Sequence, residues 1–341
     1  MAEFYPKEIS SVIGLVDTYL LWNNENNNHR GFEHYHPSAF GRCLRLMQYQ
    51  RYAERGLVEP HPKPSEPFLI RTWGNGHSMH DRWRSYFEDI GVLRGYWVCM
   101  NPLCSATSDN GEINTSITAA DLKDPGKWIK SRRVYGKDEL QGCFKPEKCI
   151  CGWKKFHYDE INVTSKELNF IGHADLILDF SRLNPDRFAG VRQMYKIEEL
   201  PKNPIVIDMK SCNHYDFQDV AKGNPHDYYI IQLMIYANIL QCDYGVLIYE
   251  NKNNQRTAAF KVERKPELWE QICRQAKEMN EMVEVADEDG NTLNLLPPPR
   301  PKSKSDKECD YCAFQDICHN SSIWADPELA SKRKEFYGDL L

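Results

Sequence analysis

The chain has 341 residues, of which 41% are hydrophobic and 27% charged, with a formal net charge of −6. This length supports one large domain or two, with a substantial core. The acidic balance excludes a globally basic nucleic-acid-binding protein, but a local basic patch is compatible with it because a surface field depends on where the charges lie. No apolar run approaches the roughly 20 residues of a membrane span, and the N-terminus lacks a secretory pattern. We therefore expect a soluble, intracellular protein with no membrane partner.

Twelve cysteines are many for a chain of this kind. In a reducing compartment, grouped cysteines more often ligate metals or clusters than form disulfides. The groups at residues 99–151 and 309–318 are therefore candidate metal sites.

Near the N-terminus, an apolar patch at 13–22 precedes an asparagine-rich tract at 23–28, for which we predict a polar loop without function. Residues 37–52 then show a loose helical pattern of apolar side chains, with Ser38 as the N-cap. This segment is locally basic, through Arg42, Arg45, Arg51 and Arg55. These arginines either form a solvated helix face or contact phosphate groups.

Residues 72–90 predict an amphipathic helix, because apolar side chains recur at helical spacing from Met79 to Ile90. Gly76 lies one turn before His80 and would let another backbone or a ligand approach closely. A lone histidine beside an apolar stripe is usually a satisfied core or surface residue. His80 becomes a candidate ligand only if acidic residues converge on it.

Residues 96–158 have the character of an insertion, with polar sequence between two cysteine-bearing turns. This pattern resembles a zinc ribbon, in which thiolate ligation replaces a core. The candidate ligands are Cys99, Cys104, Cys149 and Cys151. Because the second pair has one intervening residue where two are usual, Cys143 or His157 could substitute, and free thiols are the alternative.

The sequence becomes strand-like at 156–163 and 168–180, where Asp175 interrupts an apolar run and Gly172 allows close approach. The strand at 204–211 places Asp208 and Lys210 on one face, because strand side chains alternate. A polar excursion at 181–203 separates the two strands, so Asp175 and Asp208 could be neighbours in one hairpin. The pair is then either a metal ligand with a catalytic lysine or a surface ion pair that closes a buried strand.

Residues 224–240 predict an apolar helix in which Gln232 and Tyr236 share a face. A hairpin at 244–249 and 257–262 and a helix at 266–286 follow, and then a flexible proline-rich segment at 296–301. Beyond it lie Cys309, Cys312 and Cys318, which lack a fourth ligand that Cys43 could supply. Four thiolates could hold an iron–sulfur cluster or a zinc ion, and the residues alone do not choose.

Taken in order, these elements resemble the PD-(D/E)xK nuclease superfamily. More narrowly, they resemble its RecB-type branch with an iron–sulfur cluster, which includes the Cas4 and AddB nucleases and related phage exonucleases. The resemblance rests on Ser38…Cys43-Leu-Arg, Gly76-x-x-x-His80, Gly172-His-Ala-Asp175, Asp208-Met-Lys210, Gln232-x-x-x-Tyr236 and the cysteines 309, 312 and 318. It departs from the usual pattern because Met209 precedes the lysine, the excursion between the catalytic strands is long, and the insertion is not general to the family.

The resemblance implies an α/β fold with a restriction-endonuclease-like core, in which helices flank a central mixed sheet. It implies Mg²⁺ or Mn²⁺ bound by His80, Asp175 and Asp208, with the Met209 carbonyl as a further ligand. Lys210 would position the attacking water, and Gln232 and Tyr236 would position DNA and the lysine. A [4Fe–4S] cluster would join the N- and C-terminal parts through Cys43, Cys309, Cys312 and Cys318.

We accordingly expect an N-terminal helical region at 1–95, a zinc-binding insertion at 96–158, the nuclease core at 159–287 and a linker with the iron–sulfur cysteines at 288–341. The expected activity is a metal-dependent DNA exonuclease that acts on single- or double-stranded ends, with 5′ to 3′ polarity as one option, alongside recombination or replication proteins. The bacterial cytoplasm or a phage-infected cell is the expected location. The alternatives are an endonuclease, a non-catalytic DNA-binding module on a nuclease fold and, with least support, a redox protein.

Overall fold

The computed structural model describes residues 7–27, 31–62, 65–101, 104, 132–183, 200–289 and 295–338. Most of the predicted excursion at 181–203 and the middle of the predicted insertion lie outside the described residues. The helices are α1 (Lys7–Asn27), α2 (Pro37–Phe40), α3 (Leu44–Glu54), α4 (Pro67–Ile90), α7 (His214–Ala221), α8 (Asp227–Ile239), α9 (Pro266–Asp289), α10 (Gln315–Asn320) and α11 (Leu329–Tyr337).

Within the described residues, a mixed eight-stranded sheet has the order β10-β9-β8-β7-β1-β2, with β3 and β4 also paired to β1. Its strands are β1 (Leu93–Cys99), β2 (Val134–Tyr135), β3 (Cys143–Phe144), β4 (Phe156–Asp159), β7 (Leu176–Leu178), β8 (Ile205–Cys212), β9 (Tyr244–Asn251) and β10 (Thr257–Glu263). A separate hairpin joins β5 (Ile161–Ser165) and β6 (Phe170–Ala174). Among the named strands of the described residues, β8 and β9 alone pair in parallel, through the crossover that contains α7 and α8.

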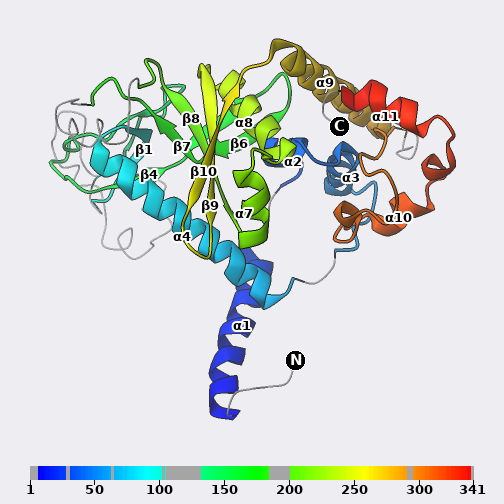
Figure 1. The fold of residues 1–341 in the computed structure, drawn as a ribbon, viewed down its shortest axis with the longest axis horizontal. Coiled ribbons are helices and arrows are strands. Elements are labelled where there is room, and N and C mark those ends of the chain that lie inside the picture. The colour runs from blue at the N-terminus through cyan, green and yellow to red at the C-terminus, as the bar shows by residue number, and fades with distance from the viewer. Residues whose placement is uncertain are drawn as a thin grey trace.

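The central strand β8 separates two hydrophobic clusters by the alternation of its side chains. Val206 packs in one cluster with α8, whereas Ile207 and Met209 pack in the other beside Met79 of α4. Helix α4 therefore covers one face of the sheet and α8 the other (Figure 1). This arrangement confirms the predicted sheet flanked by helices, and it also confirms the amphipathic helix that carries His80.

Two elements predicted as continuous are divided in the structure. The helix predicted over 37–52 breaks between α2 and α3, where Cys43 takes an extended backbone and becomes the N-cap of α3. The strand predicted over 168–180 breaks at Asp175, since β6 pairs with β5 whereas β7 joins the main sheet. At each break a predicted ligand, Cys43 or Asp175, lies outside the regular backbone hydrogen bonding of the helix or strand.

The C-terminal part packs on the N-terminal part, on the side of the molecule away from β1 (Figure 1). The proline-rich segment predicted to be flexible is held there: Arg45 Nη1 donates to Pro297 O at 2.9 Å, Arg333 Nε to Pro299 O at 2.9 Å and Tyr337 Oη to Pro298 O at 2.8 Å. The segment is thus a fixed connection, because its carbonyl groups are satisfied by buried side chains.

Helix α1 extends away from the body of the molecule and meets the start of α4 (Figure 1). The asparagine-rich tract predicted as a loop continues this helix as far as Asn27. No described helix is long and apolar enough to cross a membrane. The predicted domain boundary at residue 95 runs through β1, which pairs with β7 in the main sheet.

Candidate active site and metal centres

Strand β8 presents Asp208 and Lys210 toward α8, beside Gln232. Lys210 Nζ lies 2.9 Å from Asp208 Oδ1 and 2.8 Å from Oδ2, and Gln232 Nε2 donates to Oδ1 at 2.9 Å. Asp208 is fully buried, and its Oδ2 has a nearby charge but no well-oriented hydrogen bond. A buried carboxylate is costly unless it is paired or binds a metal, and here the Lys210 ammonium supplies the paired charge.

Asp175 lies opposite Asp208, because β7 and β8 pair antiparallel with Leu176 across from Ile207. Its Oδ2 accepts a hydrogen bond from the Met209 backbone N–H at 2.9 Å. The two predicted catalytic carboxylates are therefore neighbours across the β7–β8 pairing, with Asp175 just before the start of β7.

His80 reaches this site from α4, with Nε2 3.0 Å from Met209 O and Nδ1 3.6 Å from Asp175 Oδ1. Because a carbonyl oxygen can only accept, Nε2 donates to it, which leaves Nδ1 facing the Asp175 carboxylate. A metal ion placed between Nδ1 and this carboxylate could bind both. The Met209 carbonyl, expected to be a metal ligand, also accepts the hydrogen bond that orients His80.

Helix α4 is fixed over the site by Glu250 of β9, a buried residue. Trp83 Nε1 donates to Glu250 Oε2 at 2.7 Å, and Arg82 forms an ion pair with the same carboxylate. These bonds lie one turn beyond His80 and so set the position of its ring.

Glu160 is a site residue that the sequence did not reveal. One ligand atom each of His80, Glu160 and Asp175 lies within 4.8 Å of the others, an arrangement that could hold a metal ion. Glu160 falls between β4 and β5, and only its position as an acid at a break between two strand-like runs could have indicated it.

Burial raises the pKa of two carboxylates of the site, and the nearby Asp175 adds to both increases. Burial raises the pKa of Glu160 to about 7, and Asp175 adds to the increase. Burial likewise raises the pKa of Asp208 to about 7 against the lowering effect of Lys210. For Lys210, the attraction of Asp208 and Asp175 outweighs burial, so its pKa lies above its usual value. A divalent cation would relieve the repulsion between these acids.

Tyr236 closes the apolar side of the site. Gln232 Nε2 donates to Tyr236 Oη at 3.2 Å, so that one glutamine joins the tyrosine to Asp208.

A Cβ at Gly172 would lie 3.2 Å from Pro37 Cδ and 3.4 Å from Tyr236 Oη. Pro37 and Tyr236 thus approach the backbone closely at Gly172, as predicted, and a larger residue would crowd them. At Gly76, by contrast, the nearest atom to such a Cβ would be Ser211 Oγ at 3.7 Å, an ordinary contact.

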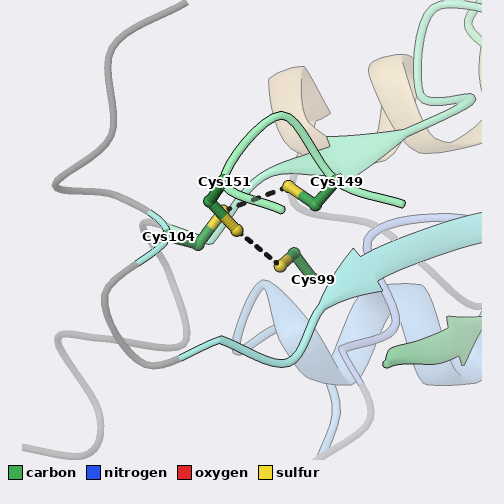
Figure 2. A group of neighbouring side chains, drawn as sticks. All are labelled: Cys99, Cys104, Cys149 and Cys151. Atoms are coloured by element: carbon green, nitrogen blue, oxygen red, sulfur yellow. Dashed lines mark hydrogen bonds between the residues drawn. The ribbon is translucent and has the colours of Figure 1, made fainter. Parts of the chain in front are cut away.

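The four cysteines predicted in the insertion converge at the end of β1 (Figure 2). The Sγ atoms of Cys99 and Cys151 are 3.7 Å apart and those of Cys104 and Cys149 are 3.6 Å apart, too far for disulfides. A tetrahedral ion with Zn–S bonds of about 2.3 Å separates its thiolates by about 3.8 Å, so the group fits one metal ion. Neither Cys143 nor His157, the substitutes considered from the sequence, belongs to it.

Hydrogen bonds from two neighbouring side chains orient two of these sulfurs. Tyr135 Oη donates to Cys149 Sγ at 3.2 Å, and Asn101 Nδ2 donates to Cys151 Sγ at 3.3 Å. Although burial raises the pKa of Cys149, the Tyr135 hydroxyl and the Cys151 backbone N–H lower it to about 7. The thiolate that metal binding requires is therefore accessible at neutral pH.

The second set of cysteines, Cys43, Cys309, Cys312 and Cys318, lines one pocket between the start of α3 and the C-terminal segment. No three of their sulfurs gather within 4.8 Å of one another, unlike those at the end of β1. Burial raises the pKa of Cys43 to about 11, while backbone N–H groups of Arg300 and Leu46 act on its sulfur in the opposite direction.

The arginines predicted to contact DNA are mostly structural. Arg45 and Arg51 are buried, the former bonded to Pro297 O and the latter to Tyr35 Oη and Asn280 Oδ1 at 2.7 Å each. Their prediction as DNA contacts was wrong, because α3 turns both guanidinium groups into the protein. Arg42 is exposed and lies 4.4 Å from the centre of the Tyr228 ring.

The fold is thus a mixed α/β fold of the PD-(D/E)XK type, with a cysteine group that could hold a metal ion. The family model described as "PD-(D/E)XK nuclease superfamily" matches residues 197–319, a span that contains Asp208, Lys210, Gln232 and Tyr236. The match points to metal-dependent cleavage of nucleic acid.

Solved and curated proteins were also compared with the chain. A solved structure titled "Crystal structure of SSO0001" is similar over 91% of this chain and 97% of that chain, at 15% identity and a TM-score of 0.41. No curated protein sequence matches the chain.

Proposed function

We propose that the protein is a metal-dependent deoxyribonuclease that removes nucleotides from DNA ends, with 5′ to 3′ polarity as the first direction to test. One observation carries the proposal. Two carboxylates on neighbouring segments, a histidine whose Nδ1 faces one of them and a lysine meet where Asp175, just before β7, lies beside β8. A surface ion pair, the competing interpretation of Asp208 and Lys210, would not bury the carboxylate completely.

His80, Asp175, Asp208 and the added acid Glu160 would hold Mg²⁺ or Mn²⁺. Such ions would neutralise charge on the phosphoryl group and lower the pKa of a bound water. Carboxylate oxygens suit Mg²⁺, and the histidine nitrogen tilts the preference toward Mn²⁺.

In the proposed mechanism, Lys210 acts through the positive charge of its ammonium group. Its ammonium is held against Asp208, with part of its surface open to solvent, so that it can hydrogen-bond the attacking water or a phosphoryl oxygen. Gln232 keeps Asp208 in place through Oδ1. Tyr236 acts through Gln232 and is a positioning residue.

A row of cations and aromatic rings leads from the surface to Lys210. The guanidinium of Arg42 lies over Tyr228, the rings of Tyr228 and Tyr229 are 4.3 Å apart, and Lys210 Nζ lies 4.6 Å from the centre of Tyr229. Cations suit phosphates and neighbouring aromatic rings suit bases, which supports this row as the path of the substrate strand.

The first experiment compares wild type with Asp208→Ala on end-labelled linear DNA, with Mg²⁺, Mn²⁺ or neither. Cleavage by the wild type should need a metal, and the variant should lose it. Asp243→Ala, which changes an exposed aspartate outside the site, is the matched control. Full metal-dependent cleavage by Asp208→Ala would overturn the proposal.

A closed circular DNA distinguishes the exonuclease from the alternative endonuclease, since a strict exonuclease leaves the circle intact. Label at either end, on single and double strands, gives polarity and strand preference. Binding of DNA without nicking under either metal would instead support a non-catalytic module. An exonuclease of this type would act together with recombination, repair or phage replication proteins.

For the cysteines 43, 309, 312 and 318 we propose a [4Fe–4S] cluster, because sulfurs spread around one pocket suit a group larger than a single ion. For the group at the end of β1 we propose zinc. Visible absorption of anaerobically purified protein, with iron and zinc quantification, tests both. Zinc without iron would refute the cluster, and iron without zinc would refute the zinc site.

A further inference from the structure

The turn that carries Cys149 and Cys151 presents a group of side chains that nuclease chemistry does not use. We call residues 148–155 the cysteine knuckle. Its backbone is fixed: Cys149 N donates to Trp153 O at 2.7 Å, Gly152 N donates to Cys149 O at 2.8 Å and Gly152 has a positive φ of 80°. With the sulfurs turned inward, the knuckle exposes 46% of Ile150 and 41% of Trp153.

Basic side chains surround these exposed apolar ones. Lys148, Lys154 and Lys155 are all exposed, and none forms an ion pair with a carboxylate of the described residues. The knuckle itself contains no acid. In a chain with a net charge of −6, this is a local concentration of unpaired positive charge.

An exposed tryptophan among unpaired lysines suits nucleic acid better than a protein partner. The indole face can stack on a base or pack on a sugar, and the ammonium groups can neutralise phosphates. A purely apolar docking site would not need three lysines, and a solvated charged surface would not need an exposed indole.

The knuckle is connected rigidly to the proposed active site. Residues 153–155 lead directly into β4, which is paired to β1 and ends at Asp159, immediately before Glu160. Seven residues from Trp153 to Glu160 span at most about 23 Å at roughly 3.3 Å each. This distance corresponds to about seven base pairs of duplex at roughly 3.4 Å per step. One DNA molecule can therefore reach both places.

We infer that the cysteine knuckle is a second DNA-binding surface, which grips the duplex within about seven base pairs of the scissile phosphate. It contacts the backbone through Lys154 and Lys155, with Trp153 packed against an exposed base or sugar. The inference rests on the proposed function for its substrate, but it concerns binding and not the chemistry.

The test compares the double variant Lys154→Glu/Lys155→Glu with Lys265→Glu/Lys334→Glu, a control with the same charge change at exposed lysines of the C-terminal half. Binding of a labelled duplex is measured by anisotropy in an Asp208→Ala background with Mg²⁺, as a function of salt. The knuckle variant should bind at least about tenfold more weakly, and its salt slope should fall by about two, one for each lost phosphate contact. Trp153→Ala should weaken binding by about tenfold and leave the salt slope unchanged.

Cleavage separates this inference from the proposed function. In the otherwise wild-type enzyme, the knuckle substitutions should raise KM for long duplexes and leave kcat unchanged, and they should have no effect on duplexes shorter than about seven base pairs. Affinity and salt slope equal to those of the control would overturn the inference. Absence of cleavage by the wild type would refute the proposed function while leaving the binding comparison decisive for the knuckle.

Discussion

Replacing Asp208 by asparagine in the metal-free protein should change how stability depends on pH. The pKa of Asp208 is raised from 3.8 to about 7, so between these values the folded protein binds a proton that the unfolded chain releases. Stability therefore falls as pH rises through this window, and the full cost is present above the folded pKa. Asparagine has the same shape and cannot ionise, so the variant should escape this loss.

The magnitude follows from the shift. Each pKa unit corresponds to about 1.4 kcal/mol, and about two units separate pH 5 from the folded pKa. Between about pH 5 and pH 8, the wild type should lose about 3 kcal/mol of unfolding free energy relative to Asp208→Asn. Urea denaturation of both proteins at several pH values, in the presence of a chelator, measures the difference.

Asp179 provides a matched control in the same sheet. It is also buried, but its bonds to Ser181 and Arg94 outweigh burial and hold its pKa below the usual value. Asp179→Asn should therefore lower stability by a similar amount at pH 5 and pH 8, because both lie above its titration. If Asp208→Asn and the wild type kept parallel curves across this range, the assignment of a strained, cation-seeking carboxylate would be refuted.

Three further substitutions test the surroundings of the site. Gly172→Ala should lower the free energy of unfolding by about 1–3 kcal/mol, because the new Cβ overpacks against Pro37 and Tyr236. Gly74→Ala has no atom within 4 Å of its new Cβ and should stabilise α4 by about 1 kcal/mol. Thermal unfolding measures both changes, and equal effects would contradict the close packing at Gly172. Cys149→Ser should abolish bound zinc and Cys273→Ser should not, as zinc quantification will show. Glu160→Gln should weaken Mn²⁺ binding by about tenfold or more in calorimetry, and unchanged affinity would remove Glu160 from the ligand set.

The parts of the site that the sequence predicted are those governed by local periodicity. Alternation along a strand places Asp208 with Lys210, and helical spacing places Gln232 with Tyr236, whatever the rest of the fold does. The pairing of β7 with β8 followed from the order of two strand-like runs. The cysteines of the knuckle and of β1 could be grouped because thiolates need a common ion.

The parts that it could not predict depend on contacts between distant segments. Glu160 joins His80 only because β4 leads to the edge of the site. Arg45 and Arg51 looked like a basic face, yet each finds acceptors more than 200 residues away that α3 alone cannot show. Cys43 became an N-cap because the chain turns between α2 and α3, which the helical pattern of 37–52 concealed.

The central claim is that Lys210 acts in catalysis and not only as the ion-pair partner of Asp208. Single-turnover cleavage of end-labelled DNA by saturating enzyme with Mn²⁺ tests it most directly, with wild type and Lys210→Ala compared after their DNA affinities are measured. We expect nearly equal affinity and a rate about a hundredfold to a thousandfold lower for the variant, the loss typical of one preorganised electrostatic group. Cleavage by Lys210→Ala at the wild-type rate would contradict it.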